Sequence, residues 1–298
     1  MPQATAHAPA HFTTPRALPA VFILLWSTGY ISGKSVLGHA APFTICFVRF
    51  ACVALILGTA AVASGARWPR GREALHLAVT GLLAQAVQFN ALYYGLTLGV
   101  SVGVAALIMG LMPIATTVLA APLLGERTTP RQWVGLVAGL GGVALVVANK
   151  MNTGSAPWPA YSAIVIALAG LSLGTLYQKR FCARMDLRSG ACVQYIAAAI
   201  ASLPFALGVE DFRADWSIGM ASALGWLVLV NSVLGATMLS MLIRAGSAAK
   251  VASLFYLVPG VAAVMGLVAF GERLTPVAIV GFAVTTAAVW VCTRVRGR

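Results

Sequence analysis

Long apolar runs, separated by short polar or Gly/Pro-containing breaks, follow one another along almost the whole chain. Each run is close to the roughly 20 residues that a helix needs to cross a bilayer. The pattern predicts ten membrane-spanning helices, at residues 18–37, 42–63, 74–96, 101–124, 130–148, 159–178, 189–208, 218–242, 249–270 and 275–293. Residues 1–15 precede the first run, and we expect them to form a disordered cytoplasmic tail.

The stretch at residues 107–147 recurs without a gap at residues 253–293, which is 146 positions later. The matching positions include a proline, a Gly-Glu-Arg turn and a Thr-Pro pair: Pro113 with Pro259, Gly125–Arg127 with Gly271–Arg273, and Thr129-Pro130 with Thr275-Pro276. Such residues mark the bends and starts of helices, so a chance match between apolar segments does not explain them. We therefore predict two copies of one module, at residues 16–150 and 151–298.

Each copy contains five of the predicted helices. Because five is an odd number, the second copy must enter the membrane from the side opposite to the first. The predicted fold is an all-α integral membrane protein, with ten transmembrane helices as a 5+5 inverted-topology repeat around a central cavity. Two inverted copies that exchange conformations provide alternating access, which favours a transporter.

The composition supports a membrane protein and gives no sign of an enzyme. Hydrophobic residues make up 60% of the chain and charged residues 9%, with a mean hydropathy of +0.89, which the surface of a soluble domain would not tolerate. The metalloprotease motif His-Glu-x-x-His does not occur. The cysteines lie in or beside apolar helices without pair spacing, so we expect no disulfide, metal site or cofactor: Cys46, Cys52, Cys182, Cys192 and Cys292.

The basic residues predict the orientation. Of the 20 lysines and arginines, 15 lie at the two chain ends and in the even-numbered loops, and 4 lie in the odd-numbered loops. Cytoplasmic loops carry the excess of positive charge, so both termini are expected in the cytoplasm. The basic residues that give the net charge of +13 would then lie next to anionic lipids of the inner leaflet. They are distributed over several short loops, which argues against a nucleic-acid partner.

The segment Phe47-Val48-Arg49-Phe50, the central prolines of the fourth and ninth helices and the duplicated Gly-Glu-Arg-x-Thr-Pro sequence resemble the EamA-type family of the drug/metabolite transporter superfamily. The resemblance extends over nearly the whole chain. It implies an inner-membrane exporter of amino acids, including aromatic or other apolar ones, or of other small metabolites. It also implies a cavity lined by the first, third, fourth, sixth, eighth and ninth helices.

Two other transport functions stay open at this stage. One is a phosphate or nucleotide-sugar exchanger, which would want paired lysine or arginine side chains in the cavity. The other is efflux of drugs or toxic compounds. The expected partners are a small-molecule substrate and the lipid bilayer, and a monomer is one option for the oligomeric state.

Polar and aromatic side chains inside the spans are the candidates for substrate contacts, because polar groups in lipid are costly and tend to line cavities. The third helix is the richest in them, with Gln85, Gln88, Phe89 and Tyr93. The other candidates are Trp26, Tyr30, Met109, Thr175, Asn231 and Tyr256. For each aromatic residue, packing or anchoring at the membrane interface is the alternative explanation.

Arg49 is the one charge well inside a predicted span, where it could bind a substrate carboxylate. A structural or snorkelling role is the favoured alternative, and Lys34 near the end of the first helix has the same two interpretations. All seven acidic residues lie in loops or at helix ends, so no midplane carboxylate is predicted for proton–cation antiport. Glu126 and Glu272 are expected near helix starts, paired with the adjacent arginine.

Pro113 and Pro259 lie near the middle of their predicted spans. There a proline removes a backbone hydrogen bond and bends the helix, so a matched pair of kinks is expected. These kinks are either static bends that aid packing or hinges that move during transport.

Overall fold

The computed structural model describes residues 17–124, 129–152, 156–182, 185–235, 238, 257–272 and 275–293. Within these ranges the chain is helical, and the only β structure is an isolated bridge between Ala40 and Ala214. Six of the described helices are long and apolar enough to cross a membrane, and three further apolar helices are shorter. The prediction of an all-α membrane protein is confirmed, whereas the count of ten spans and their inverted arrangement remain predictions.

The helices of the first copy follow the predicted spans closely. They are α1 (Leu18–Val36), α2 (Pro42–Ala63), α3 (Arg72–Gly81), the π-helix η1 (Leu82–Val87), α4 (Gln88–Thr97), α5 (Val102–Met109), α6 (Met112–Leu124) and α7 (Pro130–Asn152). The segments α3, η1 and α4 form one continuous span at Arg72–Thr97. Proline at the first turn of α2 and the Ser101 side chain, which accepts a hydrogen bond from the Val104 N–H, explain two of the helix starts.

The second copy contains α8 (Trp158–Phe181), α9 (Leu187–Gly208), α10 (Ile218–Trp226), the π-helix η2 (Leu227–Leu234), α13 (Val258–Phe270) and α14 (Pro276–Thr293). The 146-residue offset of the repeat maps α6 onto residues 258–270, which are the bounds of α13, and maps the start of α7 onto the start of α14. The internal repeat in the sequence is therefore also a repeat of helix boundaries.

Both copies carry a π-helical segment at the same place. The offset maps Leu82–Val87 onto residues 228–233, which lie inside η2. It also maps Gln85 onto Asn231. A π-helix holds one extra residue per turn relative to an α-helix, and such segments are rare and frequent at functional sites. The sequence pattern did not predict them.

The predicted kink of the fourth span takes the form of a break between two helices. In the fourth predicted span, α5 ends at Met109 and α6 begins at Met112, so Pro113 lies in the first turn of a new helix. Pro259 likewise lies in the first turn of α13, and residues 249–256 of the ninth predicted span are outside the described ranges. The break lies one helical turn before Pro113, which has no N–H to donate to the Met109 carbonyl, so the fourth span at Val102–Ala120 is interrupted near its middle as predicted. A hinge role for Pro113 and Pro259 stays a prediction.

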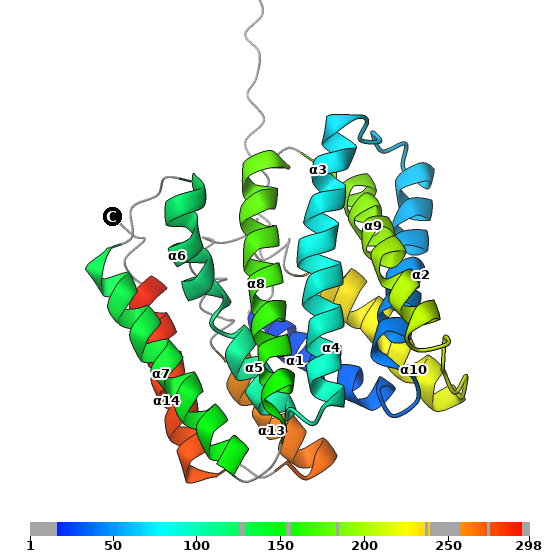
Figure 1. Cartoon of the computed structure of the whole chain (residues 1–298). Coiled ribbons are helices and arrows are strands. Elements are labelled where there is room, and N and C mark those ends of the chain that lie inside the picture. Colours follow the sequence, from blue (N-terminus) through cyan, green and yellow to red (C-terminus); the bar gives the residue numbers. More distant parts are fainter. Residues whose placement is uncertain are drawn as a thin grey trace, which may run out of the picture.

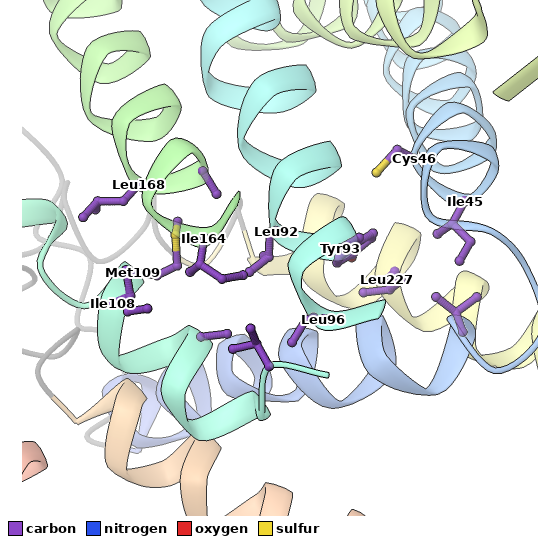
Figure 2. Close-up of a cluster of buried hydrophobic side chains, with 14 of the residues drawn as sticks. Ile45, Cys46, Leu92, Tyr93, Leu96, Ile108, Met109, Ile164, Leu168 and Leu227 are labelled. Atoms are coloured by element: carbon purple, nitrogen blue, oxygen red, sulfur yellow. The ribbon is translucent and has the colours of Figure 1, made fainter. Parts of the chain in front are cut away.

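The two copies interlock (Figure 1). Helix α2 packs on α9, α4 on α8, and α13 on both α1 and α5, while α7 and α14 pair at one edge of the molecule. The largest buried cluster draws side chains from both copies, including Ile45 and Tyr93 of the first and Ile164 and Leu227 of the second (Figure 2). Large hydrophobic side chains such as Ile218 and Val268 are exposed on the outside, as expected for residues that face lipid.

Candidate functional site

Arg49 is buried at the junction of the two copies, with 3% of its surface exposed. Its Nη1 donates to the hydroxyl oxygen of Tyr93 at 2.8 Å. Its Nε and Nη2 donate to the hydroxyl oxygen of Ser232 at 3.3 and 3.1 Å, and the guanidinium lies 4.1 Å from the centroid of the Phe89 ring. One side chain of α2 thus contacts α4 of its own copy and η2 of the other.

This guanidinium has no carboxylate partner among the described residues. A guanidinium carries five N–H groups, and the bonds to Tyr93 and Ser232 use three of them. A buried charge normally needs a counter-charge, because leaving water is costly. The snorkelling interpretation of Arg49 was wrong, since its head group lies in the protein core instead of reaching an aqueous interface.

Tyr30 and Tyr93 lie around the same point. Tyr93 is 1% exposed, and its ring packs against Gly33 so tightly that a Cβ there would lie 2.9 Å from the ring. Tyr30 packs partly buried against the same cluster, and Met109 is 5% exposed within it. Tyr93 of α4 therefore contacts Arg49 directly, whereas Tyr30 of α1 also packs against the two smaller buried clusters around Phe22 and Val102.

Asn231 ties η2 to α1. Its Nδ2 donates to the Leu25 carbonyl at 2.9 Å and to the Trp26 carbonyl at 3.5 Å, next to Gly29. Its Oδ1 is buried without a hydrogen-bond partner in the described part of the chain. Gln85, at the equivalent position of the first copy, likewise has a buried Oε1 without a described partner. Each copy therefore holds one such amide oxygen in its π-helical segment.

The remaining candidates are more scattered. The Thr175 hydroxyl donates to the Leu171 carbonyl of its own helix at 2.7 Å, so its proton is not available for a hydrogen bond to a substrate. Gln88 is half-buried at the start of α4, and its backbone lies close to Gly170 of α8. Tyr256 lies outside the described residues. No sequence signal marks Ser232, because it is one of several serines in apolar spans and its partner Arg49 is on another helix.

The model of the EamA-like transporter family matches this chain twice, at residues 17–148 and 158–294. The chain belongs to the EamA-like transporter family. The predicted family is thereby confirmed, and the protein is a transporter and not an enzyme. The two matched segments correspond to the two copies of the repeat.

Several relatives of this EamA-like transporter carry descriptive names. It is 27% identical to the inner membrane transporter YedA of Escherichia coli strain K12, over 88% of this chain and 84% of YedA. It is 26% identical to a protein of Streptantibioticus cattleyicolor named a probable terminal-alkyne amino-acid exporter, over 91% of each chain. A probable amino-acid metabolite efflux pump of Salmonella typhimurium is 24% identical over 92% of this chain and 93% of the pump.

A solved crystal structure shares the fold. It superposes with a TM-score of 0.67 at 20% sequence identity and covers 93% of this chain and 96% of that one. At this identity the likeness supports the architecture of the EamA-like transporter and carries no information on substrate.

Lys34, the second candidate cation, already has a carboxylate partner within the protein. Its Nζ lies 2.7 Å from Glu272 Oε1 and 4.9 Å from the centroid of the Phe270 ring. Glu272 therefore binds Lys34 of α1. The expected pairing of Glu272 with Arg273 and the whole Glu126–Arg127 pair fall outside the described residues. In the described ranges of the EamA-like transporter, no group of three His, Cys, Asp or Glu side chains is placed to hold a metal ion.

Proposed function

We propose that this protein exports small metabolites of the amino-acid type across the bacterial inner membrane by alternating access, with both termini in the cytoplasm. Several relatives are named amino-acid exporters or efflux pumps, and one is named an inner membrane transporter, which supports the substrate class and the membrane. The distribution of lysine and arginine supports the orientation.

The observation that carries the proposal is the buried Arg49 without a carboxylate partner among the described residues. A substrate carboxylate would supply the missing counter-charge through the two N–H groups that Tyr93 and Ser232 leave unused. Hydrogen bonds between ions are short and roughly twice as strong as neutral ones, and the surrounding core strengthens them further. The Phe89 and Tyr30 rings suit the apolar part of such a substrate.

The buried amide oxygens of Gln85 and Asn231 suit the other end of an amino acid. Each is an acceptor without a described partner, and an ammonium group has donors only. A zwitterionic substrate would thus find one cationic group and separate neutral acceptors on helices of both copies.

The alternative functions fit these contacts less well. A phosphate or nucleotide-sugar exchanger would need a second free cation near Arg49, and Lys34 is held by Glu272 at 2.7 Å. A transporter of organic cations would want a carboxylate deep in the membrane. Among the described residues the most buried acid is Glu210, and it is engaged by the start of α2.

The test is amino-acid flux in proteoliposomes, measured for the natural protein and for Arg49→Gln and Arg49→Lys. A charged hydrogen-bond pair is worth about 1.5–3 kcal/mol, so Arg49→Gln should lower kcat/KM roughly tenfold to hundredfold, and Arg49→Lys should lose less. Arg213→Gln is the matched control, because Arg213 forms an exposed ion pair with Asp211. Flux of Arg49→Gln equal to that of Arg213→Gln would move the carboxylate site elsewhere.

A further inference from the structure

One face of the molecule joins the two copies through a pair of carboxylates. This outer face, predicted to be extracytoplasmic, comprises the segments at residues 37–41, 98–101, 209–217 and 271–272, toward the lower end of Figure 1. The isolated bridge between Ala40 and Ala214 lies here, as does a hydrogen bond from the Ala41 N–H to the Arg213 carbonyl.

Glu272 is the first of the two carboxylates. Its Oε1 accepts from Lys34 Nζ at 2.7 Å and from the Val102 N–H at 2.8 Å, and its Oε2 accepts from the Gly103 N–H at 3.4 Å. The first N–H groups of a helix have no partner within the helix, and the helix dipole favours a negative charge there. A single side chain of the second copy therefore holds both α1 and the start of α5.

The local sequence prepares this contact. Gly271 ends α13 with a φ of 65°, a left-handed conformation that glycine adopts at little cost, so the chain reverses and Glu272 turns back toward the bundle. Gly266 leaves room for the carboxylate, because a Cβ there would lie 2.8 Å from Glu272 Oε2. The ion pair is largely removed from water, with side-chain exposures of 28% for Lys34 and 11% for Glu272.

Glu210 is the second carboxylate and makes an equivalent contact. It follows α9, and it accepts from the Phe43 and Thr44 N–H groups at 3.0 and 2.7 Å and from the Thr44 hydroxyl at 2.9 Å. Phe43 and Thr44 lie in the first turn of α2, and α2 is the first-copy counterpart of α9. On this face, a carboxylate at the end of a second-copy helix thus caps a first-copy helix at two separate places.

We propose that Glu272 and Lys34 form a latch that keeps the outer face closed and must release for substrate to leave. The proposal rests on the transport function proposed above. The latch is linked to the substrate site by a short path: Lys34 follows Gly33, Gly33 packs against the Tyr93 ring, and Tyr93 binds Arg49. A substrate that reorders the contacts of Arg49 therefore shifts α1 at the residue next to the latch.

The test measures access from outside to a residue behind the latch. Ala106 is fully buried one helical turn after Val102 and packs with Val102 and Ala262. In a background in which the five native cysteines are replaced, an Ala106→Cys variant is treated in right-side-out vesicles with a membrane-impermeant maleimide. The rate is normalised to the labelling of denatured protein, so that poor folding does not count as access.

Loss of the latch should open this path. Lys34→Met leaves the carboxylate and its helix-capping contacts in place, and it should raise the labelling rate of the Ala106→Cys variant at least about tenfold, as expected if the ion pair shifts the closed-to-open ratio by that factor. Glu272→Gln should do the same. Lys34→Arg keeps the positive charge, and Asp211→Asn removes the exposed ion pair with Arg213 on the same face. Both variants should therefore be labelled at the rate of the Ala106→Cys variant that carries no further substitution.

The assay contains no substrate, which separates this proposal from the proposed function. Faster labelling after Lys34→Met supports the latch even if amino-acid flux is never found. Equal labelling rates in Lys34→Met, Glu272→Gln and Asp211→Asn overturn the latch even if the protein exports amino acids. The latch is also overturned if the Ala106→Cys variant with Lys34 and Glu272 unchanged is labelled as fast as the Lys34→Met variant.

Discussion

The guanidinium of Arg49 is buried, and it forms no ion pair with a carboxylate among the described residues. Two hydroxyl groups and one aromatic ring replace part of its hydration. The sequence could identify this residue as unusual, because it is a charge inside an apolar run. It could not distinguish a structural from a binding role, since the partners Tyr93 and Ser232 lie 44 and 183 positions away along the chain.

At this scale the Tyr93 hydroxyl can be tested separately from its ring. Tyr93→Phe removes the acceptor of Arg49 Nη1 and keeps the packing against Gly33. We expect kcat/KM for substrate to fall roughly tenfold, because a hydrogen bond to a charged group is worth about 1.5–3 kcal/mol. Flux in proteoliposomes measures this. Tyr94→Phe, at the exposed neighbouring position, should transport normally, and an equal loss in both variants would contradict the assignment.

At the scale of elements, most helix bounds could be predicted because their causes are local. Pro42 and Pro130 at helix starts are visible in the sequence, and both helices begin at those residues. The π-helical segments η1 and η2 could not be predicted, because the extra residue leaves no mark in the hydrophobic pattern. The interruption between α5 and α6 has a local cause in Pro113, which is visible in the sequence, whereas the packing of Gly110 against Pro259 of the other copy is not.

Close approach between helices gives a prediction for this scale. Gly81 lies against α9, where an added Cβ would collide with the Gln194 backbone, while Gly141 of α7 has no neighbour within 4 Å of such a Cβ. Gly81→Ala should lower the free energy of unfolding by about 1–3 kcal/mol, as overpacking usually does. Gly141→Ala should lower it little or not at all. Thermal unfolding in detergent compares the two, and equal midpoints would show that α3 and α9 can separate without cost.

At the scale of the whole molecule, the duplication and the membrane class could be predicted from the sequence. The repeated proline, Gly-Glu-Arg and Thr-Pro positions and the apolar composition can be recognised without knowing which residues are in contact. The way in which the copies join could not be predicted. Glu210 and Glu272 are at helix ends, as expected, but their partners on α1, α2 and α5 belong to the other copy. Contacts between copies depend on three-dimensional packing, which no local pattern encodes.

The orientation in the membrane is a prediction for the whole molecule. Reporter fusions after Arg72 and after Arg188 should behave as cytoplasmic, and a fusion after Ala156 should behave as extracytoplasmic, because 15 of 20 basic residues lie on the predicted inner side. Alkaline phosphatase and fluorescent-protein fusions give opposite signals on the two sides and control for expression. Reversal of any two of these positions would exclude the ten-span arrangement.

The paired π-helical segments also carry information about history. One added residue rotates all that follows in a helix by about 100°, so a later insertion into a finished transporter would misdirect an entire helical face. The most economical explanation is that the insertion is older than the gene duplication and was inherited by both halves. Under the predicted inverted arrangement of five helices per half, a half-length ancestor would have had to assemble as an antiparallel pair of separate molecules before fusion made that pairing permanent.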